Sequence, residues 1–112
     1  MAAHAKALTA SIIAAFALAA ADAAVAQSRG RRSQIMEQCV GAVLGRLARA
    51  GAPESQVGPA VVSQCDGPLR ARLAAEVAAG RAGGCTVETC LDMARSRAAE
   101  EATQAYRSTV RR

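Results

Sequence analysis

The sequence predicts an all-α protein, a small three- to four-helix bundle stapled by two disulfides, after a cleaved signal peptide. Three observations favour this fold. Apolar residues after residue 26 recur at spacings of three and four, as on one face of a helix, and no segment shows a strand pattern. The cysteines are even in number and all follow residue 26, as in small exported proteins. Residues 1–26 have the pattern of a secretory signal.

The predicted signal peptide is short and apolar, and it ends in small residues. Lys6 lies in a polar start, and residues 7–21 form a run without charge. Residues 24–26, Ala-Val-Ala, fit the small-x-small rule for cleavage. An uncleaved membrane anchor is the alternative, but the apolar run is short for a membrane span and Asp22 follows it closely. We therefore expect a mature chain of residues 27–112.

The mature chain is predicted to be one basic domain, with a flexible basic arm over residues 27–32 and a disulfide-stapled helical domain over residues 33–112. It has 13 arginines, no lysine, 8 acidic residues and no histidine, which leaves a net charge of +5. Tyr106 is its only aromatic residue. Because large apolar side chains are few, the core is thin, and disulfides commonly supply the missing stability in domains of this size.

The first predicted helix begins at Ser33, whose hydroxyl suits an N-cap, and stops just before Gly51, which fits a C-cap. Its apolar stripe consists of Met36, Val40, Val43, Leu47 and Ala50. Gly41 and Gly45 are four residues apart on this helix. Since neither has a side chain, we expect a groove there into which another helix packs closely.

Two shorter helices follow a connection over residues 52–58. Pro59 suits the first position of the second helix. That helix carries Val61, Val62 and Cys65. Residues 66–68, Asp-Gly-Pro, then break the chain, and the third helix ends at Gly80. Its apolar positions are Leu69, Leu73 and Val77. Residues 81–84 are predicted to form a flexible hinge.

The last and longest helix is predicted to run from Val87 to about Thr109. Thr86 is the expected N-cap, and Glu88 lies near the positive end of the helix dipole. The apolar stripe consists mostly of small residues: Val87, Leu91, Ala94, Ala98 and Ala105. Beyond Ala98 the apolar content is low, so we expect this end of the helix to project or fray.

Four cysteines allow three disulfide pairings, and the N-cap at Thr86 favours one of them. With this cap, Cys85 and Cys90 occupy the two positions that a hydrophobic staple brings together at the start of a helix. Inside a regular helix they would lie about 7.5 Å apart along the axis, beyond the usual separation in a disulfide. The favoured pairing therefore joins Cys85 to Cys90 and Cys39 to Cys65. The two crossed pairings remain open.

Residues 27–112 carry no motif for catalysis, a cofactor or a metal, and we expect none of the three. Without histidine, a Ser-His or Cys-His pair is excluded. Cys85 and Cys90 are too widely spaced for a Cys-x-x-Cys redox site, and the first two cysteines lack the C-x2-4-C spacing of structural zinc sites. The acidic residues are scattered, and no glycine-rich phosphate loop is present. Nucleic acid is not an expected partner, because no aromatic residues interleave with the arginines.

Two hypotheses for function remain. The first is a non-enzymatic protein-binding module of the cell envelope, periplasmic or secreted, such as an inhibitor, an immunity protein or a chaperone-like factor. It rests on export, on the disulfide-held helices and on an alanine-lined last helix that can accept a helix of a partner. The alternative is a cationic binder of anionic membrane or envelope-polymer surfaces. Its candidate contacts are Arg29, Arg31, Arg32, Arg107, Arg111 and Arg112.

Overall fold

The computed structural model describes residues 23, 27 and 29–111 of the chain. The chain divides into two compact units, Met1–Arg31 and Arg32–Arg112. In the first unit, residues 23, 27 and 29–31 are helical and exposed. The signal peptide predicted over residues 1–26 lies outside the described residues, apart from Ala23, so its cleavage stays a prediction.

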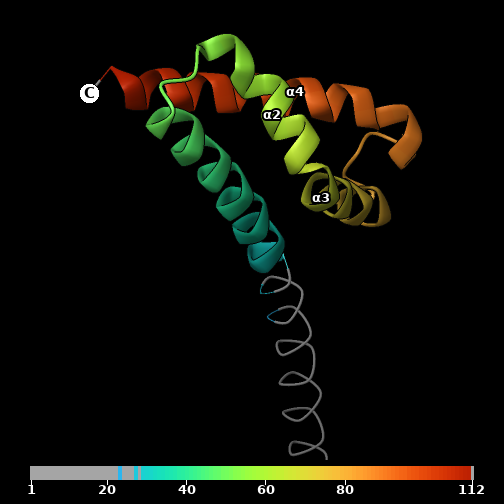
Figure 1. Cartoon of the computed structure of the whole chain (residues 1–112). Helices are drawn as coiled ribbons and strands as arrows, with labels where there is room; N and C mark the ends of the chain where they lie inside the picture. Colours follow the sequence, from blue (N-terminus) through green and yellow to red (C-terminus); the bar gives the residue numbers. More distant parts are fainter. Residues whose placement is uncertain (1–22, 24–26, 28, 112) are drawn as a thin grey trace, which may run out of the picture. The chain divides into compact units, whose positions relative to one another are not determined.

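Every regular element of the second unit is a helix, which confirms the all-α prediction. Its first helix, over residues 32–49, is followed by the 3-10 turn η1 and three α-helices (Figure 1). Their bounds are η1 Glu54–Gln56, α2 Val57–Gln64, α3 Asp66–Ala78 and α4 Val87–Val110. None of the described residues is in a strand. The helix α4 is the longest, and α2 and α3 both pack against it.

The start of the first helix is a correction to the prediction. Ser33 is already helical, and so is Arg32, so Ser33 is not an N-cap. Arginine has a high intrinsic helix propensity, and no proline stands before Ser33 to stop the helix there. The described residues of the other unit, 29–31, are helical as well.

Both glycine C-caps are confirmed, and they use the same mechanism. Gly51 has φ +64 and Gly80 has φ +71, in the left-handed region that favours glycine. After Gly51 the Ala52 amide donates to the Leu47 carbonyl at 2.9 Å, and after Gly80 the Arg81 amide donates to the Glu76 carbonyl at 2.9 Å. These are the bonds of a Schellman motif, which satisfies carbonyls that a helix end leaves free.

The second and third helices begin earlier than predicted. Each starts two residues before its proline, so Pro59 and Pro68 both occupy the third helical position. Proline is tolerated there, because the amides of the first helical turn have no partner within the helix. As a result the predicted break over residues 66–68 shrinks to a corner at Cys65, where α2 ends and α3 begins.

The start of α4 follows the prediction. The Thr86 hydroxyl accepts a hydrogen bond from the Thr89 amide at 3.2 Å, and the Thr86 amide donates to the Thr89 hydroxyl at 2.9 Å. This is a capping box with threonine in place of the more usual glutamate. Glu88 lies in the first turn, at the positive end of the helix dipole.

The far end of α4 packs into the core, which overturns the prediction that it projects or frays. Ala102 and Tyr106 are only 3% and 4% exposed, whereas Ala105, which we placed in the apolar stripe, is exposed. The Tyr106 hydroxyl donates to the Ala52 carbonyl at 2.5 Å. The buried ring of Tyr106 therefore supplies apolar contact area at this end of α4, and its hydroxyl joins α4 to the turn after the first helix. The core also contains Met36, Val43, Val57, Val61, Cys65, Leu69 and Ala98.

The glycine that permits a close contact between two helices is Gly58 on α2, and not Gly41 or Gly45 on the first helix as predicted. A Cβ on Gly58 would lie 3.2 Å from the Ala99 Cβ, so this glycine lets α2 approach α4 closely. A Cβ on Gly41 would meet nothing within 4 Å, and one on Gly45 would meet only the Arg49 side chain at 3.4 Å. No helix of the described residues packs closely on the predicted glycine groove.

Candidate functional site

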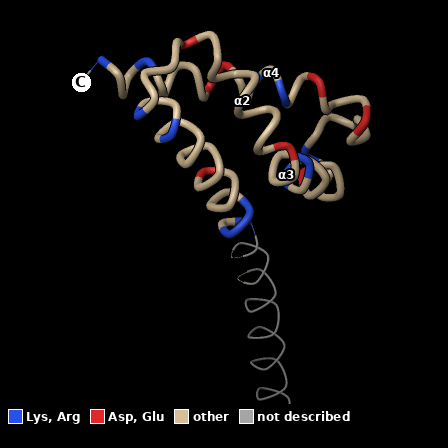
Figure 2. The backbone as a smooth tube through the Cα atoms, viewed as in Figure 1, with Lys and Arg blue, Asp and Glu red and all other residues tan. Residues whose placement is uncertain are grey.

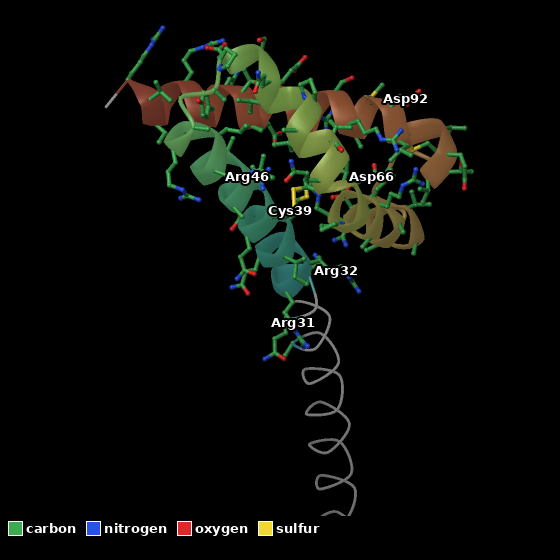
Figure 3. The ribbon with its side chains drawn as sticks, in the orientation of Figure 1. Arg31, Arg32, Cys39, Arg46, Asp66 and Asp92 are labelled. Carbon is green, nitrogen blue, oxygen red and sulfur yellow. A yellow bond between two sulfur atoms is a disulfide. The ribbon has the colours of Figure 1, made fainter. Side chains whose placement is uncertain are left out.

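The Cys39–Cys65 disulfide joins the first helix to the corner between α2 and α3 (Figure 3). The two Cα atoms lie 5.9 Å apart, within the usual range for disulfides. Cys65 is fully buried. This bond closes a long loop of chain and joins the core residue Cys65 to Cys39, which packs against the core, so its main effect is on the stability of the whole domain.

The Cys85–Cys90 disulfide is local and half-buried. Its Cα atoms are 6.0 Å apart, and the cysteines occupy the position before the N-cap and the fourth position of α4. It therefore fixes the turn that joins α3 to α4. Both pairs match the pairing that the sequence favours, and the described residues contain no free cysteine. Two disulfides indicate an oxidising environment.

Asp66, labelled in Figure 3, pairs with Arg70 on the same helix, α3, and with Arg95 on α4. Its carboxylate accepts from Arg70 Nε at 2.6 Å and from Arg95 Nη2 at 2.9 Å, and the second bond connects α3 to α4. The hydrogen bond from Arg70, followed by the one from Arg95, lowers the pKa of the Asp66 carboxyl below its usual value. Arg95 also lies 3.7 Å from Asp92, so two carboxylates face these two arginines.

A second ion pair occupies one of the arginines predicted to contact an anionic surface. Arg107 Nε donates to both carboxylate oxygens of Glu54 at 3.1 Å. This hydrogen bond lowers the pKa of Glu54 and raises that of Arg107. Of the other candidates, Arg29, Arg31 and Arg111 are exposed and Arg32 is half-buried, whereas Arg112 lies outside the described residues. Arg29 and Arg31 belong to the other unit.

Three further arginines line one groove between α3 and α4. The groove has a volume of about 280 Å³ and contains Arg72 from α3, Arg81 from the following turn and Arg97 from α4. None of the three forms an ion pair with a described residue. Among the described residues, Glu76 is the only acidic one that lines it. We call this the arginine groove; its described lining has three arginines against one acid, although Arg72 also lines a second groove beside Glu37 and Glu101.

The floor and rim of the arginine groove are apolar. Leu69, Leu73 and Ala94 line it, and Met93 stands on α4 with 68% of its surface exposed. An exposed methionine next to an apolar floor is typical of a surface that adapts to a partner. Cys90 also lines the groove, so the Cys85–Cys90 disulfide holds one wall in place.

The sequence did not predict the arginine groove. Arg72 and Arg97 are 25 positions apart, on different helices, and no spacing relates them to Arg81. Only the turn between α3 and α4, closed by Gly80 and by the disulfide, brings them together. Figure 2 shows acidic and basic residues of both signs along the helices, so a count of arginines by segment does not reveal it. The signal that was available is their number: 13 arginines against 8 acids leaves several without partners.

A second groove, the alanine groove, lies between the first helix and α4 and has a volume of about 370 Å³. Its α4 wall is formed by Ala98, Ala102 and Ala105, which follow at intervals of four and three residues. Val40 and Leu44 of the first helix line the other side. The predicted alanine-lined surface of the last helix therefore exists, but the first helix already covers part of it.

Two further findings bear on the chemistry of residues 23, 27 and 29–111. No group of three histidine, cysteine or acidic side chains is placed to hold a metal ion. No helix within this part of the chain is both long enough and apolar enough to cross a membrane.

No protein-family model, no curated protein and no solved structure matches this chain. The arginine groove is the surface feature whose side chains contribute least to the packing of the domain. Its three arginines form no ion pair with a described residue, and Met93 at its rim is exposed.

Proposed function

We propose that this protein is a small exported, non-enzymatic protein-binding module of the cell envelope, in the periplasm or outside the cell. Inhibitors, immunity proteins and chaperone-like factors are the classes we have in mind. The observation that carries the proposal is the arginine groove, in which three arginines that form no ion pair with a described residue surround an apolar floor. An exposed apolar surface that is rimmed by polar or charged side chains is typical of a site that binds a partner protein.

The two disulfides support binding because they preorganise the surface. Binding is weakened by the entropy lost when loops and side chains become ordered. The Cys85–Cys90 bond and the capping box fix the turn that carries Arg81 before any partner arrives. The two disulfides also support the exported part of the proposal, since disulfides form and persist in oxidising compartments.

A cationic surface binder is the second candidate. Its support is the exposure of Arg29, Arg31 and Arg111. The ion pair between Arg107 and Glu54 weakens it, because that side chain is already engaged. The arginines of the groove favour the first candidate, since a concave site fits a side chain or a helix better than it fits a flat membrane.

Salt separates the two candidates. The chain is exported, purified from an oxidising compartment and mixed with an extract of the cell envelope of its native host. A stoichiometric protein complex that persists in roughly 0.5 M salt supports the binding module, because Debye screening removes most contacts between exposed charges. Retention on lipid or polymer that disappears at that salt supports the surface binder. Export is tested separately on chain isolated from whole cells of the native host and examined by mass spectrometry; a chain that still begins at Met1 with four free thiols would falsify export.

A further inference from the structure

The arginine groove has a chemistry that specifies its partner more narrowly. The groove contains Arg72, Arg81 and Arg97 from three successive elements, and Glu76 is the one acid among its described lining residues. Guanidinium groups bind carboxylates in a fork geometry and with charge-assisted hydrogen bonds. A ligand that satisfies the groove therefore carries several carboxylates.

The apolar part of the groove adds a second requirement. Leu69 and Leu73 are buried at its floor, whereas Met93 is 68% exposed at its rim. A purely acidic ligand leaves that surface in contact with water. An occupant with an apolar side chain between its carboxylates covers Met93 and pairs with the arginines at once.

The geometry points to an acidic amphipathic helix of an exported partner protein as the occupant of the arginine groove. This inference rests on the proposed function and names the chemistry of its partner. The α4 residues that line the groove run from Cys90 to Arg97, about 10 Å along the helix axis. Two turns of a partner helix fill that length, with apolar residues facing the floor at intervals of three or four and acids on either side.

A protein helix fits this groove better than an anionic membrane does. Membranes present a flat array of charge, whereas these arginines line a concave site between two helices. Glu76 also lies among the lining residues, and its carboxylate repels a uniformly anionic surface. A helix can place one donor opposite Glu76 and acids opposite the arginines, which fixes its orientation.

The test maps what touches Met93. A photo-crosslinking amino acid is placed at position 93 and, as the control, at position 110, which is also an exposed apolar position of α4. Each protein is mixed with envelope extract in roughly 0.5 M salt, irradiated and digested, and the attached peptide is sequenced. We expect crosslinking from position 93 and not from 110, to a segment with acidic residues on both sides of apolar ones.

Two triple variants with equal charge then test the arginines. Arg72→Gln/Arg81→Gln/Arg97→Gln empties the groove of positive charge, and Arg29→Gln/Arg31→Gln/Arg32→Gln removes the same charge elsewhere. Binding of a synthetic peptide copied from the mapped segment is measured for both. We expect on the order of tenfold weaker binding for the first variant, since exposed ion pairs are weak singly and add up. The second variant should change it by less than about twofold.

Circular dichroism shows whether each variant folds. If the groove variant does not, Arg81→Gln/Arg97→Gln replaces it, because both side chains are exposed in the free protein. A neutral or basic mapped segment, or equal effects of the two variants, overturns the partner chemistry while a salt-resistant complex still supports the proposed function. Binding only to vesicles of phosphatidylcholine and phosphatidylglycerol, with no protein complex, overturns both.

Discussion

The two ends of the domain are held together by different means. At the core end, the first helix, α2 and the second half of α4 bury Val43, Val57 and Tyr106, and the Cys39–Cys65 bond crosses between helices. At the hairpin end, α3 and the start of α4 leave Met93 and three arginines open, and the Cys85–Cys90 bond stays within one turn.

The contrast suggests a division of work within one small chain. Core packing and the long-range disulfide supply the global stability of the domain. Met93 and the three groove arginines at the hairpin end are therefore not needed to hold the core together. Its local disulfide and capping box keep that surface in shape without a large core. Changes at the two ends should therefore differ both in size and in how far their effects reach.

The largest expected effect comes from removing the disulfide of the core end. Cys39→Ser/Cys65→Ser opens a loop with a sequence separation of 26 residues, and the chain-entropy model assigns such a loop about 3.5 kcal/mol. That is a large share of the net stability of a small domain. We expect the free energy of unfolding, measured by urea titration, to fall by about this amount. A loss below roughly 1 kcal/mol would show that this bond does not hold the core together.

The disulfide of the hairpin end should matter less and act locally. Cys85→Ser/Cys90→Ser opens a loop with a sequence separation of 5 residues, worth about 2 kcal/mol in the same model. We expect amide hydrogen exchange to speed up most in residues 80–90, with smaller changes around Tyr106. Equal acceleration at both ends would contradict the division proposed for the molecule.

Tyr106 tests how the core end closes. Tyr106→Phe keeps the ring but removes the hydrogen bond to the Ala52 carbonyl, so we expect a loss of about 1 kcal/mol in the free energy of unfolding. Thr86→Ala, which removes the N-cap at the hairpin end, is a matched change of similar expected size. Only the tyrosine variant should raise the rate of amide hydrogen exchange in the turn at residues 50–53.

A pair of glycine substitutions measures helix packing at the core end. Gly41→Ala should stabilise the protein by roughly 0.5–1 kcal/mol, because alanine is the better helix former and a Cβ there meets nothing within 4 Å. Gly58→Ala should lose that gain, since its Cβ would lie 3.2 Å from the Ala99 Cβ. Thermal unfolding of both variants decides this. Equal stabilisation by the two would mean that α2 does not need a glycine to approach α4.

The smallest expected effect is the pH dependence that Asp66 and Glu54 confer. Their ordinary pKa values are 3.8 and 4.5, and their arginine partners lower both in the folded protein. The stabilisation is therefore full above those ordinary values and is lost as the pH falls through the lowered pKa of each folded carboxyl. Because both pairs are open to solvent, we expect a small effect. Asp66→Asn should flatten the pH dependence of the urea midpoint below pH 3.8, the ordinary pKa of this carboxyl, and an unchanged profile would contradict it.

The start of α4 could be predicted from the sequence, both in its N-cap and in its local disulfide. Thr86, Cys85 and Cys90 are close in sequence, so their relation depends only on helix geometry and an N-cap. The C-caps at Gly51 and Gly80 were predictable for the same reason. The starts of α2 and α3 were not, because proline favours the first helical position but is tolerated at any position of the first turn, so it does not fix where the helix starts.

The sequence by itself determined the helical class, the C-caps at Gly51 and Gly80, and the start of α4 with its local Cys85–Cys90 pair, since these follow from interactions within a few residues. It favoured Cys39–Cys65 only as the pair that remained. Only the tertiary structure decided that Tyr106 closes the core, that Gly58 rather than Gly41 lies at the close helix contact, and that Arg72, Arg81 and Arg97 share a groove. These depend on contacts between residues far apart in the chain. Helical periodicity states which face of each helix is apolar, but it does not state which other helix that face meets.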